Sequence, residues 1–178
     1  MDLDKQGNKK KIGILGGTFD PAHKGHLSIS KEAKKRFDID KIIWAVTKKN
    51  PFKEKSLLSL NKRIEIAKKI CSKYKFIEVV FFEKKIKSNK TIKLLNYLKK
   101  KYNNSEIYFL MGADNLISFH KWHGWKKILS KSKILVFDRH GYKKKSFKSV
   151  TFKRFNKKNI EFVKFKKVNI SSSKLRKI

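Results

Sequence analysis

Residues 12–26 read Ile-Gly-Ile-Leu-Gly-Gly-Thr-Phe-Asp-Pro-Ala-His-Lys-Gly-His, an apolar stretch followed by a glycine turn and two histidines. The apolar start predicts a buried first strand at 12–15. The glycines let the main chain approach a phosphate, because no Cβ stands in the way. A helix beginning near His23 or Gly25 would add N–H groups and a partial positive charge, and would place His23 and His26 on one side of its first turn. Imidazole donates hydrogen bonds to phosphate oxygens, so the segment predicts a polyphosphate site.

Apolar runs alternate with helical periodicity along the rest of the chain. The pattern predicts further strands at 42–46, 76–82, 106–111, 134–137 and 160–165 and helices after Ser59, over 90–102 and over 122–129, with a basic irregular loop at 140–159 and a helix at the C-terminal end. This is the α/β class, a Rossmann-like doubly wound parallel sheet. In the strand order 3-2-1-4-5, the turns after strands one and four would border one crevice at the switch point.

The 178 residues suffice for a single domain, which we expect over residues 12–178, preceded by a flexible basic arm at residues 1–11. The arm lacks the apolar segment of a secretory signal, and no apolar run reaches the roughly 18 residues that span a bilayer. Cys71 is the only cysteine, which excludes a disulfide framework within the chain. A cytoplasmic protein is the simplest expectation.

The formal net charge is +34, which invites a nucleic-acid interpretation. Only five of the 48 basic residues are arginines, however, and the lysines are spread over nearly every segment. Base recognition favours arginine for its bidentate hydrogen bonds. We therefore expect non-specific attraction of anions and no specific nucleic-acid partner. A basic RNA-binding protein on the same fold stays as an alternative, and its binding would not depend on His26.

Two motifs carry a family resemblance. Residues 16–26, GGTFDPAHKGH, resemble the first signature of the HxGH nucleotidyltransferases, and residues 170–176, ISSSKLR, resemble the second, Ile-Ser-Ser-Thr-x-Ile-Arg, with Ser173 for Thr and Leu175 for Ile. The resemblance implies nucleotidyl transfer from a nucleoside triphosphate to a phosphate acceptor. It implies catalytic roles for His23, His26 and Arg176, ATP binding by Gly16, Gly17, Thr18, Phe19, Ser171 and Ser172, and Mg²⁺ carried with the ATP rather than held by a carboxylate cage. Asp20 would cap the following helix or orient a histidine.

Two central motifs resemble those of the nicotinate-nucleotide adenylyltransferases. They are Gly112-Ala113-Asp114-Asn115-Leu116 and Trp122-His123-Gly124-Trp125. The resemblance implies that Gly112 and Asp114 border the ATP site, that Trp122 stacks on a pyridine ring, and that Ser88, Thr91 and Lys53 bind the acceptor. From the residues alone, the tryptophans could instead be core anchors, and Ser88 and Thr91 could simply cap a helix.

The implied reaction transfers the adenylyl group of ATP to nicotinate mononucleotide and gives deamido-NAD and pyrophosphate, a step of NAD biosynthesis. The same chemistry on nicotinamide mononucleotide or on a pantetheine phosphate is the nearest alternative. The second glycine of the first motif, the tryptophan pair and Arg176 argue against the pantetheine branch. The sequence does not predict an oligomeric state.

Overall fold

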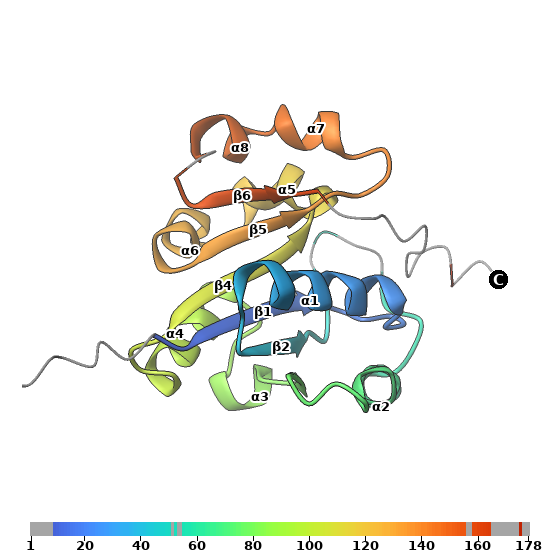
Figure 1. The fold of residues 1–178 in the computed structure, drawn as a ribbon. Helices are drawn as coiled ribbons and strands as arrows, with labels where there is room; N and C mark the ends of the chain where they lie inside the picture. Colours follow the sequence, from blue (N-terminus) through green and yellow to red (C-terminus); the bar gives the residue numbers. More distant parts are fainter. Residues whose placement is uncertain (1–8, 51, 53–54, 156–157, 165–174, 176–178) are drawn as a thin grey trace, which may run out of the picture.

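A computed structural model of the chain describes residues 9–50, 52, 55–155, 158–164 and 175. Its six strands form one parallel sheet in the order β3-β2-β1-β4-β5-β6 (Figure 1). They are β1 (Lys11–Gly17), β2 (Lys41–Val46), β3 (Ile77–Val80), β4 (Glu106–Gly112), β5 (Lys133–Phe137) and β6 (Ile160–Val163). The order contains the predicted 3-2-1-4-5 arrangement and confirms the doubly wound parallel sheet.

Helices connect the strands and cover both faces of the sheet. They are α1 (Lys24–Phe37), α2 (Leu60–Cys71), α3 (Glu83–Ile86), α4 (Thr91–Lys101), α5 (Ala113–Ser118), α6 (Trp125–Lys131), α7 (Lys143–Phe147) and α8 (Val150–Phe155), with a 3₁₀ turn at Phe119–Lys121. Each of these helices is too short or too polar to span a bilayer, as far as the described residues go.

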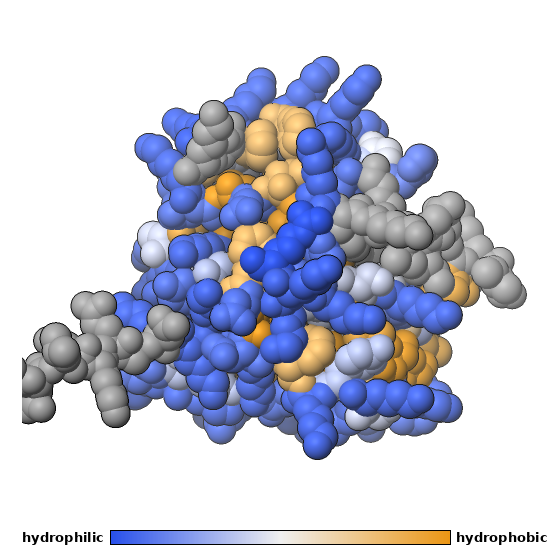
Figure 2. Space-filling model, viewed as in Figure 1, coloured by the Kyte–Doolittle hydropathy of each residue, from blue (hydrophilic) through white to orange (hydrophobic). Residues whose placement is uncertain are grey.

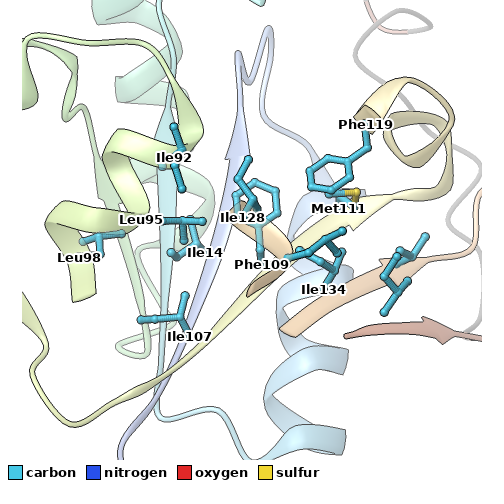
Figure 3. Close-up of a cluster of buried hydrophobic side chains, with 14 of the residues drawn as sticks. Ile14, Ile92, Leu95, Leu98, Ile107, Phe109, Met111, Phe119, Ile128 and Ile134 are labelled. Atoms are coloured by element: carbon cyan, nitrogen blue, oxygen red, sulfur yellow. The ribbon is translucent and has the colours of Figure 1, made fainter. Parts of the chain in front are cut away.

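The core has two halves because successive strand side chains point to opposite faces. Trp44 and Leu110 pack with α1 and α2 on one face. Ile14, Ile43 and Phe109 pack with α4, α5 and α6 on the other. Figure 3 shows this second half, where α4 supplies Ile92, Leu95 and Leu98 as its sequence pattern predicts.

The region 140–159, expected to be an irregular loop, instead contains α7 and α8. That prediction is wrong because three phenylalanines that are separated in the sequence meet in space. The Phe147 ring lies 4.6 Å from that of Phe152 and 4.7 Å from that of Phe162 in β6. A packed aromatic cluster anchors the two short helices against the edge of the sheet.

Other boundaries also shift. The helix expected over 122–129 begins at Trp125, because Gly124 adopts a left-handed conformation and Trp122 ends the preceding 3₁₀ turn.

The third strand stops at Val80, and Phe82 precedes the short α3. β1 begins at Lys11, which the sequence placed in the arm. Residue 165 of the last predicted strand and the start of the predicted C-terminal helix lie outside the described residues.

Hydrophilic side chains cover most of the face seen in Figure 2, without gathering over one element. The single cysteine, Cys71, is buried in α2, and burial raises the pKa of its thiol to about 12. A thiol in that environment packs as a small apolar group.

A buried hydrogen bond ties α1 to the sheet and gives a first prediction. Trp44 Nε1 donates to Ser30 Oγ at 2.8 Å, and Ser30 Oγ donates to the His26 carbonyl at 3.0 Å. Both side chains are fully buried. We expect Ser30→Ala to lower the free energy of unfolding by about 1–3 kcal/mol, because it leaves the indole N–H without its acceptor. Urea unfolding measures the change.

The matched control is Ser130→Ala. This exposed hydroxyl donates to the Lys127 carbonyl of its own helix, so its loss should change the free energy of unfolding by less than about 0.5 kcal/mol. Equal effects of the two substitutions would contradict the importance of the Trp44–Ser30 bond.

Candidate active site

A cavity of about 550 Å³ opens at the C-terminal ends of the strands. The ends of three strands and the turns that follow them contribute to its wall: residues 16–19 for β1, 111–112 and 114–115 for β4, and 137–140 for β5. Residues 88–91, which lead into α4, also line it. The chain runs from β1 outward to β2 on one side and returns to β4 on the other. The cavity therefore lies at the switch point of the sheet, where doubly wound folds bind ligands.

His23 and His26 close the first turn of α1 with each other's backbone. His23 is the N-cap residue, and its Nδ1 accepts a hydrogen bond from the Gly25 N–H at 3.0 Å. His26 Nδ1 accepts from the His23 N–H at 3.2 Å. The pair is a capping box in which imidazoles take the parts usually played by serine and glutamate. A nitrogen that accepts from an N–H carries no proton, so each neutral ring is protonated at Nε2.

The two rings lie side by side on the cavity wall, with centroids 4.0 Å apart. Partial burial and the nearby Arg139 charge lower the pKa of His23 to about 4. The His23 ring is therefore neutral at pH 7. It offers a single Nε2–H donor of fixed orientation.

The glycine turn of the first motif forms the wall beside these rings. Gly16, Gly17, Thr18 and Phe19 all line the cavity. Phe19 has a positive φ of 49°, and its buried ring stacks on Trp44 at 5.0 Å. The structure thus brings together the histidines and the backbone segment that the sequence assigned to the ATP phosphates.

Asp20 does not cap the helix that follows it, so that predicted role is wrong, whereas its predicted role in orienting a histidine stays a prediction. α1 is capped by His23, while the two oxygens of the fully buried Asp20 carboxylate accept from the backbone N–H groups of Leu57 and Leu58, at 2.8 and 3.0 Å. Asp20 thereby fastens the segment that precedes α2 to the turn that precedes α1.

The turn after β4 is helical from Ala113 and places Asp114 in an ion pair with Arg139. Gly112 and Asp114 both line the cavity, as predicted. A Cβ on Gly112 would lie 2.5 Å from Asp114 Oδ1, so a larger residue there would displace the Asp114 carboxylate. Arg139 also lines the cavity, and sequence reasoning did not select it as a site residue. Its only sequence signal was its rarity among the basic residues, together with its place just after a buried strand.

Ser88, Thr91 and Trp122 all line the cavity. Neither hydroxyl residue is the N-cap of α4. That position is Lys90, which makes no side-chain capping bond, whereas Ser88 Oγ accepts from the Lys90 N–H at 3.2 Å. The alternative of a simple helix cap is therefore wrong for both.

The two tryptophans of the central motif lie in different surroundings. Trp122 lines the cavity and sits edge-on to Phe119, with centroids 5.2 Å apart. Trp125 packs between Phe119 and Phe155 and is not part of the cavity wall. The core-anchor alternative thus describes Trp125, while Trp122 reaches both the core and the cavity.

Lys53, Ser171, Ser172 and Arg176 lie outside the described residues, and their predicted roles stay predictions. Among the residues that are described, no group of three histidine, cysteine or carboxylate side chains is arranged to hold a metal ion.

A family model described as cytidylyltransferase-like matches residues 14–178. Together with the parallel sheet and the histidine-lined cavity at its switch point, this match defines a nucleotidyltransferase.

Individual relatives narrow the class. A curated protein of Pelagibacter ubique (strain HTCC1062), named "Probable nicotinate-nucleotide adenylyltransferase", is 64% identical over 170 residues, which cover 96% of this chain and 94% of that protein. A protein of the same name from Ruegeria sp. (strain TM1040) is 39% identical over 73% of this chain and 68% of its own length. The chain belongs to the nicotinate-nucleotide adenylyltransferase family.

Solved structures agree on the fold. Plasmodium falciparum nicotinic acid mononucleotide adenylyltransferase complexed with NaAD superimposes with a TM-score of 0.77, at 22% identity, over 94% of this chain and 83% of that one. The same protein complexed with APC gives a TM-score of 0.75 over the same shares of the two chains.

The low pKa of His23 gives a second prediction. The unfolded chain takes up a proton on this residue near pH 6.5, whereas the folded chain does so only near pH 4. Between those values the unfolded state binds more protons, so the stability lent by the neutral ring is lost as the pH falls through this window. His23→Asn keeps a good N-cap acceptor and removes the titrating ring. We expect the urea midpoint of this variant to fall less than that of the wild type between pH 7 and pH 4.5.

His140→Asn is the control, because His140 is exposed. Its pH dependence should match that of the wild type. An unchanged pH dependence in His23→Asn would contradict the placement of a neutral His23 in the folded protein.

Proposed function

We propose that this chain transfers the adenylyl group of ATP to nicotinate mononucleotide, forming deamido-NAD and pyrophosphate in NAD biosynthesis. An oxygen of the acceptor phosphate attacks the α-phosphorus of ATP. The bond between that phosphorus and the oxygen bridging to the β-phosphorus breaks, and pyrophosphate leaves with the bonding electron pair. The observation that carries the proposal is the pair of imidazoles whose Nδ1 atoms are held by backbone N–H groups on the wall of a switch-point cavity.

The reaction needs alignment of two anions and neutralisation of charge, and it needs no protein nucleophile. His23 and His26 would donate from Nε2 to phosphate oxygens, with the Arg139 guanidinium, ion-paired with Asp114, close to His23. Gly16, Gly17, Thr18 and Phe19 would bring backbone N–H groups to the same phosphates. By the family motif, Ser171, Ser172 and Arg176 would complete the ATP site from the C-terminal end of the chain.

Mg²⁺ would arrive with the triphosphate as part of the substrate. Two carboxylates on the cavity wall already have partners: Asp114 pairs with Arg139, and Glu83 accepts from Thr47 and from the Lys48 N–H. Among the described residues no group of three carboxylate, histidine or cysteine side chains could hold the ion, so phosphate oxygens and water would supply most of its ligands.

The acceptor would bind between Trp122 and the start of α4. An indole face suits the electron-poor pyridinium ring. The first N–H groups of α4 have no side-chain cap and carry the positive end of the helix dipole. Lys90 and Lys121 add positive charge to the same wall. This environment favours the carboxylate of nicotinate over the neutral amide of nicotinamide. Lys53 would approach a phosphate from the loop after β2.

We place this reaction in the cytoplasm, where ATP is abundant. Nucleotides are the partners that the family supports, and no specific nucleic-acid partner is proposed.

The test is pyrophosphate release from ATP and Mg²⁺ with three acceptors at equal concentration: nicotinate mononucleotide, nicotinamide mononucleotide and phosphopantetheine. We expect kcat/KM for the nicotinate form to exceed that of either other acceptor by at least roughly tenfold, the value of about one charge-assisted hydrogen bond. Preference for another acceptor would overturn the acceptor assignment. A folded sample that binds RNA but turns over none of them would favour the RNA-binding alternative.

His26→Gln separates chemistry from folding within the same assay. Glutamine at this position can accept from the His23 N–H and so preserve the capping box. We expect an unchanged thermal midpoint and a fall in kcat of roughly a hundredfold or more, as for loss of one oriented donor to a developing charge.

A further inference from the structure

Arg63 is a buried arginine that the proposed chemistry does not use. It lies in the first turns of α2, and only 2% of its surface is exposed. Its guanidinium donates to four backbone carbonyl oxygens rather than to a substrate-facing group: Leu58 O at 3.2 Å, Thr18 O at 2.5 Å, Thr47 O at 2.8 Å and Lys48 O at 3.1 Å.

These carbonyls belong to separate segments of the chain. Thr18 follows β1, Thr47 and Lys48 follow β2, and Leu58 precedes α2. Asp20 reinforces the arrangement, because its carboxylate holds the N–H groups of Leu57 and Leu58. One planar, five-donor group therefore fixes the relative positions of the loops at the ends of two neighbouring strands.

The direction of these carbonyls sets the direction of the next N–H groups. In a trans peptide the C=O and the following N–H point opposite ways. The Thr47 carbonyl points to Arg63, and the N–H of the same peptide, on Lys48, points away and donates to Glu83 Oε1 at 3.0 Å. Glu83 lines the cavity, whereas Arg63 does not. At this peptide, the N–H that points away from Arg63 therefore points toward the cavity.

The same geometry applies to the two neighbouring peptides. Arg63 holds the carbonyls of Thr18 and Lys48, so the N–H groups of Phe19 and Lys49 face away from it. Both Phe19 and Lys49 line the cavity. Oriented backbone N–H groups in turns at the ends of strands form a typical anion site.

We propose that Arg63 is a positioning residue for the triphosphate, which it serves without contact by turning the N–H groups of Phe19 and Lys49 into the cavity as fixed donors to phosphate oxygens. The proposal deepens the proposed function and rests on it for the identity of the anion as ATP. The positive charge of Arg63 interacts with the carboxylates of Asp20 and Glu83. It lies behind the backbone that would meet the anion.

A wild-type measurement tests the orientation without any substitution. In a ¹H–¹⁵N spectrum titrated with inorganic pyrophosphate and then with ATP, we expect the Phe19 and Lys49 amide resonances to shift with the same dissociation constant. Saturable pyrophosphate binding that leaves both resonances in place would overturn the proposal.

Arg63→Lys then tests the arginine itself. Lysine keeps the charge but offers three donors from one nitrogen, too few and too compact to hold four carbonyls in two loops. We expect the ATP dissociation constant and the KM for ATP to rise by roughly tenfold or more, while the KM for nicotinate mononucleotide changes by less than about threefold. Arg36→Lys, an exposed arginine of α1, is the matched control and should change neither constant.

The outcomes separate a positioning role from a structural one and from failure of the proposed function. A variant that is less stable, yet binds ATP as the wild type does below its melting temperature, would show a structural role only and overturn the proposal. If Arg63→Lys does not fold, the wild-type titration decides. If the wild type binds ATP but turns over no acceptor, the proposed function fails, while a loss of ATP affinity in Arg63→Lys still supports positioning.

Discussion

The first turn of α1 is closed by two imidazole rings, and the site depends on this reciprocal cap. Each ring accepts a backbone N–H at Nδ1, so the fold sets the tautomer of both histidines before any ligand arrives. The same bonds fix the ring planes relative to the helix. A spacing of i and i+3 that looks like a pair of ligands is therefore also a helix start. Removing the cap would disturb both the helix and the donors.

The sheet supplies the support behind the cap. Trp44 of β2 lies under the turn, stacked on Phe19 and bonded to Ser30 of α1. Arg63 and Asp20 tie the loops after β1 and β2 to the start of α2. The cavity is thus walled by backbone segments whose directions are set from behind by buried side chains. Oriented donors of this kind can stabilise developing charge without reorganising during the reaction.

Local patterns predicted the six strands, the longer helices and several of the residues that line the cavity. The spacing of the glycines and histidines indicated a phosphate site, and the apolar runs indicated the strands. The residues that support the cavity wall from behind could not be predicted, because their partners are backbone atoms far away in the sequence. Nothing near Arg63 marks it as the residue that donates to the Thr18 carbonyl. For the same reason the phenylalanine cluster of α7 and α8 was missed, since its rings meet only in the folded chain. Asp114 and Arg139, 25 positions apart, follow the neighbouring strands β4 and β5 and meet only in the folded chain.

The tautomers of His23 and His26 test the account most directly. Imidazole ¹⁵N resonances of the ligand-free protein at pH 7, in a ¹H–¹⁵N correlation optimised for two-bond couplings, distinguish a proton on Nε2 from one on Nδ1 and both from imidazolium. We expect neutral His23 protonated at Nε2, and His26 with Nδ1 as an acceptor. An Nδ1–H tautomer at either histidine would contradict the reciprocal cap, and with it the orientation of the proposed phosphate donors.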